Sequence, residues 1–250
     1  MIRLIFVAAI VIGFLLFSLP YLAWLDRLGN EDPHKKNWKS LHIVQAVFRL
    51  ILKLAGVRVT VRGAENIPAD RAVLFVGNHR SYFDILVGYT TVPGLMGFVA
   101  KKEMEKIPSL SKWMKNVNCL FLDRKNVKEG LKTILVGIEQ VKKGISVWIF
   151  PEGTRNRGEV LEMLPFKEGS LKIAEKSGCY VIPVAITGTA EIFEKQFPRI
   201  KKSHVIVEYG KPIDLKALEP QQRKFAGAYV RGVILEMLKA QLEEREHEKK

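Results

Sequence analysis

The segment from Asn78 to Asp84 contains a histidine and a carboxylate five positions apart, His79 and Asp84. It follows the apolar run 72–76 and Gly77, as a working loop follows a buried strand. A carboxylate beside an imidazole fixes the tautomer of the ring and stabilises its protonated form. These residue types therefore make His79 a candidate general base with Asp84 as its orienting partner.

The chain must bend between His79 and Asp84 if the two side chains are to meet. On one unbroken helix they would point about 140° apart, because each residue turns the helix by roughly 100°. Ser81 and Asp84 form a helix-start signal, with Ser81 as the N-cap and Asp84 at the third helical position. A helix that starts there turns Asp84 back toward His79. The segment alone leaves open a simpler interpretation, in which Asp84 only caps a helix and His79 is an ordinary loop residue.

Polar clusters follow three further apolar runs of the chain, at residues 101–103, 123–125 and 151–158. Ligands of parallel sheets bind at the carboxyl ends of the strands, so we expect all four clusters to lie at one site. Their basic residues, together with Lys167, predict a phosphorylated ligand, because guanidinium groups bind phosphate oxygens through paired hydrogen bonds. The basic residues are Lys101, Arg124, Arg155, Arg157 and Lys167. Gly153 would let backbone N–H groups approach such a ligand closely.

Several other kinds of site lack their sequence signatures. The loop 153–158 has the glycine spacing of a P-loop, but Glu159 and Val160 stand where lysine and serine or threonine are needed. Neither a dinucleotide-binding glycine pattern nor a serine-hydrolase elbow occurs in the sequence. The other four histidines are scattered, so we expect no metal site. Cys119 and Cys179 each lie beside apolar sequence, which predicts buried thiols rather than a disulfide framework.

The elements that must position these clusters alternate along the chain. Helices are predicted from Asn126 to about residue 143, at 168–176 and at about 221–246. Strands that are apolar along their length and alternate with helices form a largely parallel sheet covered on both faces, so we predict an α/β fold. The strands are predicted at residues 57–61, 72–76, 97–100, 119–122, 146–150, 180–186 and 205–209.

Residues 4–25 are almost wholly apolar, and their length is close to the roughly 20 residues that span a hydrocarbon core. A cleaved signal peptide needs a small-residue cleavage site, which the sequence around residues 21–24 does not offer. A simple spanning helix is a second interpretation, although Pro20 should kink or end it. Partial insertion into a membrane is the third.

Residues 40–56 have the pattern of a basic amphipathic helix, suited to the plane of a membrane interface. A short, mostly polar link at 26–39 separates it from the first apolar segment. We therefore predict a two-helix membrane-docking module at residues 1–56 and an α/β domain at residues 57–250. The alternative for the second helix is an ordinary helix that faces the protein core. If the first helix spans, the basic link places the α/β domain in the cytoplasm.

The formal net charge of +14 and a sequence pI near 9.7 predict anionic partners. Nucleic acid, anionic lipid surfaces and acidic ligands all fit such a charge, which does not choose among them. Hydrophobic residues make up 48% of the 250 residues, a share that excludes a disordered chain. The length suits one globular domain, or one domain with an appendage.

The combined motifs resemble those of the glycerolipid acyltransferases, most of all the bacterial 1-acyl-sn-glycerol-3-phosphate acyltransferases. The segments around Lys101 to Glu103 and Phe166 to Gly169 also match family patterns. One departure is Asn118, where many members have glycine before the second motif. The four motifs occur in family order as Asn78-His79-Arg80-Ser81-Tyr82-Phe83-Asp84, Phe121-Leu122-Asp123-Arg124, Phe150-Pro151-Glu152-Gly153-Thr154-Arg155 and Val181-Ile182-Pro183-Val184-Ala185.

The resemblance implies a reaction in which His79, oriented by Asp84, removes the proton from the 2-hydroxyl of lysophosphatidic acid. That oxygen attacks an acyl thioester, which gives phosphatidic acid and a free thiol carrier without an acyl-enzyme. The donor would be acyl-CoA or acyl carrier protein, whose negative charge suits a basic enzyme. No cofactor or metal is implied, and the lipid substrates imply an enzyme docked at the cytoplasmic face of the cell membrane. The fourth motif, around Pro183, is associated with the acyl donor or with structure.

The resemblance also assigns residues to substrate binding. Acceptor binding falls to Arg124, Glu152, Gly153, Thr154 and Arg155, with Lys101 as a further phosphate ligand. Lys167 joins this set as one of the basic residues at the strand ends. The acceptor itself stays open, because glycerol 3-phosphate or another lysolipid would suit the same motifs.

Two other classes of function remain for comparison. A hydrolase with Ser81 as its nucleophile would use the serine, histidine and carboxylate of the same segment. A basic membrane scaffold or nucleic-acid binder has no use for a His79 and Asp84 pair. Its aromatic residues are not interleaved with basic ones as a nucleic-acid stacking platform requires, so we expect no nucleic-acid partner.

Overall fold

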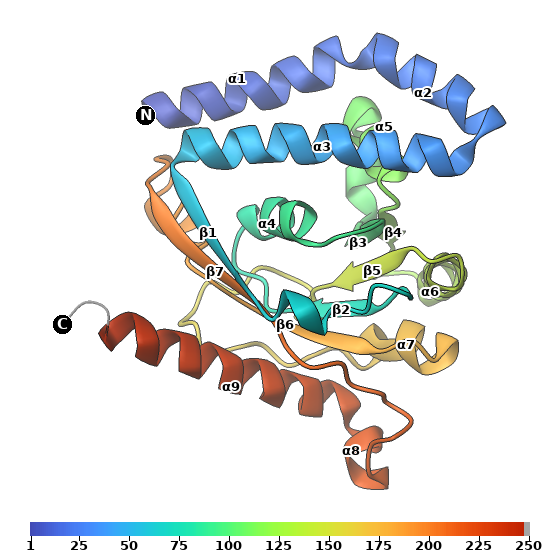
Figure 1. Cartoon of the computed structure of the whole chain (residues 1–250), viewed down its shortest axis with the longest axis vertical. Coiled ribbons are helices and arrows are strands. Elements are labelled where there is room, and N and C mark those ends of the chain that lie inside the picture. Colours follow the sequence, from blue (N-terminus) through green and yellow to red (C-terminus); the bar gives the residue numbers. More distant parts are fainter. Residues whose placement is uncertain (248–250) are drawn as a thin grey trace.

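A seven-stranded sheet forms the centre of the computed structural model, which describes residues 1–247 (Figure 1). The strand order is β1-β7-β6-β2-β5-β3-β4, and every neighbouring pair is parallel except β6 and β7. The predicted α/β fold with a largely parallel sheet is therefore confirmed, and each predicted strand is present within two residues of its expected bounds. The strands are β1 (Val57–Arg62), β2 (Leu74–Gly77), β3 (Met96–Lys101), β4 (Leu120–Leu122), β5 (Ser146–Ile149), β6 (Val181–Thr187) and β7 (Ser203–Tyr209).

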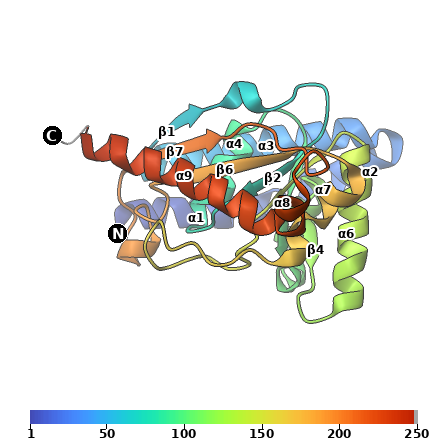
Figure 2. The ribbon, with the colours of Figure 1, turned by 90° about the horizontal axis from the view of Figure 1, so that it is seen from below.

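Helices cover both faces of the sheet. One face packs against α3, α4 and α5, and the other against α6, α7 and α9 (Figure 2). This burial on both sides explains why strands such as β2 and β6 are apolar at nearly every position. The helices are α1 (Ile2–Phe17), α2 (Leu19–Glu31), α3 (Pro33–Ala55), α4 (Phe83–Thr91), α5 (Pro108–Asn116), α6 (Val127–Lys142), α7 (Lys172–Ser177), α8 (Pro220–Lys224) and α9 (Ala226–His247).

The start or end residue that the sequence predicts is present at two of the three helices predicted in the α/β domain. The Asn126 side chain accepts the Glu129 N–H at 3.2 Å and starts α6, and Gly178 ends α7 in the left-handed conformation. The single helix predicted at 221–246 is instead two helices, which meet at Phe225. The break separates α8 from α9. Val230 and Ile234 of α9 are buried and lie four positions apart in the sequence, on the helix face that packs against the sheet.

The N-terminal segment forms three helices rather than two with a polar link. Between α1 and α2 the axis bends by 52° at Ser18, two residues before Pro20. Residues 26–39 are helical apart from Asp32, whose side chain accepts the Lys35 N–H at 2.8 Å while Pro33 opens α3. The polar composition of this stretch therefore marks a helix boundary and not an extended link.

The apolar face of α3 packs against protein. Leu41, Val44, Ile51 and Leu52 are buried in the same cluster as residues of α4 and the sheet, and α1 packs on α3 as well. The alternative of a core-facing helix is thus the one that the structure shows for this segment. Among the described helices, no single one is both long and apolar enough to cross a membrane. Only α1 and α2 taken together, across their bend, pass that test of length and composition.

Candidate active site

His79 and Asp84 form a hydrogen-bonded pair at the carboxyl end of β2. The Nδ1 atom of His79 lies 2.8 Å from Oδ2 of Asp84, whose side chain is 1% exposed. The same carboxylate oxygen accepts the backbone N–H groups of Arg80 and Ser81, each at 2.8 Å. Three donors therefore converge on one oxygen, which fixes the carboxylate and directs Nε2 of His79 away from it.

The predicted bend between the two residues is present, with one difference in detail. Helix α4 begins at Phe83, one residue later than the cap pattern predicts. The Ser81 hydroxyl accepts the Phe83 N–H at 3.0 Å rather than that of Asp84, while Asp84 reaches back to the Ser81 N–H. One carboxylate consequently serves both the helix start and the imidazole, so capping and catalysis do not compete.

The imidazole of His79 is held from several directions. Its ring stacks on Phe150 with a centroid distance of 4.1 Å and an angle of 9° between the planes. Its backbone N–H donates to Glu152 at 2.9 Å, and its backbone oxygen accepts the Asn156 N–H at 2.7 Å. Within residues 1–247, Nε2 has no hydrogen-bond partner, and the side chain is 18% exposed. A proton acceptor is thus oriented and accessible.

Glu152 links the loops that follow β2 and β5. Its two carboxylate oxygens accept the backbone N–H groups of His79 and Leu164, the latter at 3.0 Å. Burial raises the pKa of Glu152, although both N–H donors act in the opposite direction. The contacts give Glu152 a positioning function for His79, and its predicted contact with substrate stays a prediction.

Part of the basic cluster lies around Gly153. The Arg124 guanidinium donates to the Gly153 carbonyl, and a Cβ added to Gly153 would lie 2.8 Å from Cε of Lys167. Lys101 pairs in register with Leu122, which places it beside the Asp123 to Arg124 loop. Gly153 has a φ of +73°, which a glycine adopts without strain. Three of the predicted cations therefore share one neighbourhood, with Thr154 exposed beside them.

Arg155 is engaged separately from that group. Its guanidinium pairs with Glu194 at 3.1 Å and lies over the Tyr82 ring, 3.7 Å from the centroid. Arg157 is exposed and has no side-chain partner in the described part of the chain. The basic residues thus divide into the group around Gly153 and Arg155 beside the His79 loop.

Two residues of the site were missed from the sequence. Phe150 was read only as the end of a strand and part of a motif, whereas its ring supports His79. Glu194 follows β6, at the same sheet edge as the other clusters, and it contacts Ser81, Tyr82 and Arg155. The rule that polar residues gather after parallel strands would have found Glu194 if it had been extended to β6.

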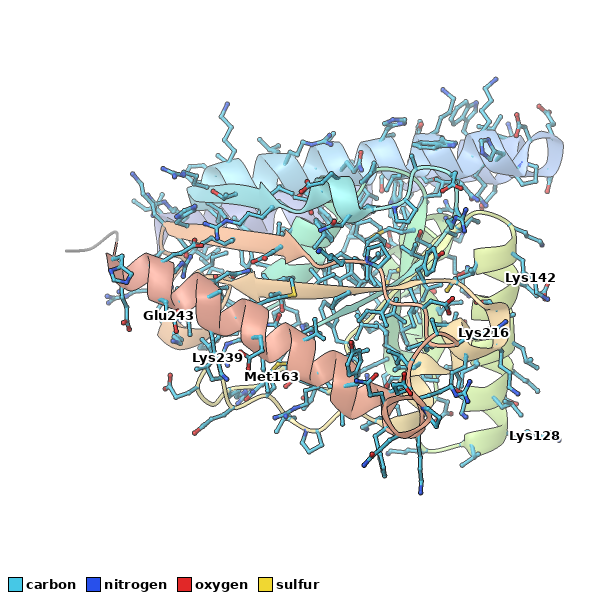
Figure 3. All side chains as sticks on the ribbon, turned by 60° about the horizontal axis from the view of Figure 1, so that its bottom comes forward. Lys128, Lys142, Met163, Lys216, Lys239 and Glu243 are labelled. Atoms are coloured by element: carbon cyan, nitrogen blue, oxygen red, sulfur yellow. The ribbon has the colours of Figure 1, made fainter. Side chains whose placement is uncertain are left out.

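Further contacts hold the loop at 151–167 in place. Arg80 donates to the carbonyls of Gly158 and Glu159 at 2.7 and 3.0 Å. On the far side, Arg231 of α9 donates to the carbonyls of Met163 and Leu164, and Figure 3 shows Met163 beside that helix. These contacts therefore fix the position of the loop that carries the residues from Gly153 to Arg155.

Ser81 is fully buried, and its hydroxyl is already occupied. It donates to Oε2 of Glu194 at 2.7 Å and accepts the Phe83 N–H. His79 Nδ1 faces Asp84, and no hydrogen bond joins the imidazole to the Ser81 hydroxyl among the residues described. The geometry gives no support to a serine nucleophile at this position.

Comparison with known proteins places this geometry among acyltransferases. Residues 58–187 match the sequence model of a family described as Acyltransferase. The chain is 31% identical over 208 residues to the 1-acyl-sn-glycerol-3-phosphate acyltransferase of Saccharomyces cerevisiae, with 82% of this chain and 67% of that one covered. It is 29% identical to the enzyme of the same name from Borreliella burgdorferi, over 80% of this chain and 79% of that one.

A solved structure shows the same likeness in three dimensions. The crystal structure of the 1-acyl-sn-glycerophosphate acyltransferase from Thermotoga maritima superposes with a TM-score of 0.79 at 27% sequence identity. The match covers 96% of this chain and 94% of that one. The likeness therefore includes the N-terminal helices as well as the sheet that carries the site.

Proposed function

We propose that this chain, which belongs to the acyltransferase family, transfers an acyl chain from a thioester to the 2-hydroxyl of 1-acyl-sn-glycerol 3-phosphate. The product is phosphatidic acid, a precursor of phospholipids. The observation that carries the proposal is the His79 and Asp84 pair at 2.8 Å, with Nε2 accessible beside a basic cluster. The names of the relatives from S. cerevisiae, B. burgdorferi and T. maritima support the choice of acceptor.

In the proposed mechanism, Nε2 of His79 removes the proton from the acceptor hydroxyl. The oxygen attacks the thioester carbonyl carbon, the carbon–sulfur bond breaks, and the proton passes from the imidazolium to the departing thiolate. Asp84 stabilises the imidazolium while it exists. The acyl group moves directly between substrates, so no acyl-enzyme forms. The donor is acyl-CoA or acyl carrier protein, both of which carry negative charge that suits a chain of net charge +14.

The acceptor phosphate is proposed to bind Arg155, with the group around Gly153 completing the site. Among the basic residues assigned to substrate binding, Arg155 contacts the His79 loop, because its guanidinium lies over the Tyr82 ring. Lys101, Arg124 and Lys167 supply further positive charge, and Gly153 and Thr154 offer backbone and hydroxyl donors. No metal or cofactor takes part in the proposed step.

The lipid nature of acceptor and product leads us to propose that the protein docks at the cytoplasmic face of the cell membrane. Helix α1 exposes the apolar side chains of Ile2, Ile5, Ile12 and Leu16, which share one face because they lie three, seven and four positions apart. An apolar helix face of this kind is stabilised in the interface of a bilayer. Docking would let the site draw its acceptor from the membrane while the soluble donor arrives from the cytoplasm.

The direct test is an acceptor panel. Purified protein is incubated with a labelled acyl thioester and, separately, with lysophosphatidic acid, glycerol 3-phosphate and another lysolipid. We expect label in phosphatidic acid from the first acceptor. Transfer to glycerol 3-phosphate alone would overturn the proposed acceptor while it left the acyltransferase chemistry in place.

The phosphate function of Arg155 is tested by Arg155→Ala. Loss of a charge-assisted contact of about 1.5–3 kcal/mol should raise KM for lysophosphatidic acid by at least about tenfold. The exposed Arg157→Ala serves as the matched control and should leave KM near the wild-type value. Equal effects of the two variants would show that Arg155 contributes only general positive charge.

A further inference from the structure

Glu194 accepts hydrogen bonds from three residues near the catalytic pair, and the proposed reaction uses none of these contacts. It opens a short turn, Glu194–Gln196, after β6, and its side chain is 17% exposed. Its Oε2 accepts the Ser81 hydroxyl at 2.7 Å. Its Oε1 accepts the Tyr82 N–H at 2.9 Å and the Arg155 guanidinium at 3.1 Å. One carboxylate thus joins the His79 loop to the loop after β5.

The Ser81 and Tyr82 contacts place Glu194 next to the catalytic pair. The backbone N–H of Ser81 donates to the Asp84 carboxylate, and the next N–H, that of Tyr82, donates to the Glu194 carboxylate. Two carboxylates therefore hold successive amides of the turn that sets Asp84 against His79. Ser81 and Asp84 are nearly fully buried, so a shift of this turn changes the direction of the imidazole.

The Arg155 contact bears on substrate binding. In the structure, the guanidinium is neutralised by Glu194 and covered on one face by Tyr82. Glu194 accepts from Nη1 of Arg155 at 3.1 Å and the Tyr82 hydroxyl accepts from Nη2 at 3.0 Å. A phosphate that binds this end of the guanidinium therefore competes with the Glu194 carboxylate. Glu194 keeps its bonds to the Ser81 hydroxyl and the Tyr82 N–H after Arg155 leaves. The exchange therefore does not leave a half-buried carboxylate without partners.

We propose that Glu194 is a positioning residue that holds the Ser81 and Tyr82 turn and releases Arg155 to the phosphate of the acceptor. The inference rests on the proposed function, since it takes Arg155 as a phosphate ligand. Without acceptor, Arg155 stays paired with Glu194. When the acceptor binds, its phosphate replaces Glu194 as the partner of Arg155, and the Ser81 and Tyr82 turn keeps its position.

The experiment compares Glu194→Gln with Glu191→Gln, which removes an exposed carboxylate paired with Lys195 in the same segment. Glutamine keeps an oxygen for the Tyr82 N–H and can donate its amide N–H to the Ser81 hydroxyl, but it carries no charge for Arg155. We expect KM for lysophosphatidic acid to fall about fivefold in Glu194→Gln, at the lower end of the range for coupled binding equilibria. KM for the acyl thioester should stay near wild type, and kcat should fall less than in Glu194→Ala because the Tyr82 N–H keeps its acceptor. Glu191→Gln should match wild type throughout.

A binding measurement separates affinity from turnover. In a His79→Ala background, without the acyl thioester so that no transfer takes place, Glu194→Gln should tighten binding of lysophosphatidic acid by about the same fivefold factor. Binding of monoacylglycerol, which lacks the phosphate, should not change. Glu194→Ala removes the turn contacts as well, so kcat should fall by at least about tenfold. Unfolding midpoints of all variants show whether each has folded.

Three outcomes would overturn the inference. The first is a KM for lysophosphatidic acid in Glu194→Gln that equals the KM of Glu191→Gln or exceeds it. The second is a gain in monoacylglycerol binding as large as the gain in lysophosphatidic acid binding. The third is a folded Glu194→Ala variant with unchanged kcat. Failure of the proposed function would look different, because the wild-type protein would then transfer no acyl group to lysophosphatidic acid.

Discussion

Asp84 shows how one residue can serve structure and chemistry together. Its Oδ2 accepts three donors, two from the backbone and one from His79, while its Oδ1 is buried without a hydrogen-bond partner in the part of the chain that the structure describes. The backbone donors fix the carboxylate before any substrate arrives. Because the position is determined in advance, the imidazolium of the proposed mechanism would need no rearrangement of its partner.

The residue-scale test of the chemistry is His79→Ala. Removal of the general base should lower kcat for lysophosphatidic acid by about a hundredfold to ten-thousandfold, and Asp84→Asn should act in the same direction. The rates are measured by release of the free thiol from the acyl thioester.

Ser81→Ala is the control for the hydrolase alternative. The variant loses the contacts of one hydroxyl with Glu194 and the Phe83 N–H but should retain much of the rate. A rate abolished by Ser81→Ala in a folded protein, with His79→Ala still active, would favour a serine nucleophile instead.

Glu152 gives a pH-dependent prediction. Burial raises its pKa in the folded protein, so the folded state binds this proton more tightly than the unfolded state does. Stability from this group is therefore fully present below the unfolded value of about 4.3 and is lost as pH rises through the folded value. The free energy of unfolding of wild type minus that of Glu152→Gln should fall across this window.

Urea unfolding at a series of pH values measures this difference. Glu159→Gln, at an exposed carboxylate of the same loop, is measured alongside as the control. A difference for Glu152→Gln that rises with pH would mean that the two N–H donors outweigh burial.

At the scale of elements, strand β3 approaches the turn that precedes β4 more closely than a side chain would allow. A Cβ added to Gly97 would lie 1.8 Å from the backbone oxygen of Asn118. Asn118 itself has a φ of +60°, in the left-handed region. Asparagine tolerates this conformation, which explains why it can stand where many family members have glycine.

Gly97→Ala should therefore destabilise the protein strongly. Overpacking against backbone, which cannot rotate away, should lower the free energy of unfolding by about 3 kcal/mol. Urea unfolding provides the measurement. Gly232→Ala on α9 is the matched control, because a Cβ there meets nothing within 4 Å, and it should stabilise by up to about 1 kcal/mol. Similar losses for both variants would contradict the close approach of Gly97 to the Asn118 backbone.

At the scale of the whole molecule, several of the exposed large apolar side chains among residues 1–247 lie on α1. It packs on α3 through one side and leaves Ile5 and Ile12 exposed at 62% and 57%. The chain adds a net charge of +14, which attracts anionic lipid. Apolar and electrostatic contributions should therefore act together at a bilayer surface.

The corresponding prediction concerns binding to vesicles that contain anionic phospholipid. Ile5→Glu combined with Ile12→Glu should weaken vesicle binding by at least about tenfold, because each isoleucine that enters the bilayer contributes about 1.5–3 kcal/mol to binding. Sedimentation with the vesicles measures the bound fraction. Leu131→Glu with Leu135→Glu on α6 makes the same change of charge at exposed positions and should have a smaller effect. Equal losses would show that charge, and not the α1 face, controls binding.

The sequence by itself determined the fold class and most of the candidate site. Strands buried on both faces must be apolar throughout, so the runs at 72–76 and 180–186 identified β2 and β6. The polar residues after parallel strands must share one edge, so His79, Arg124 and Glu152 could be grouped before any coordinates were known. Helix signals at Asn126 and Gly178 were equally local and equally reliable.

Only the tertiary structure decided which partner each of these groups has. An amphipathic pattern is the same whether its apolar face meets lipid or protein, so residues 40–56 did not reveal that α3 packs against the sheet. The contact between Ser81 and Glu194 joins residues 113 positions apart, and no local pattern encodes it. Periodicity and caps act within a few residues, whereas the pairing of Arg155 with Glu194 depends on how the loops after β5 and β6 meet in space.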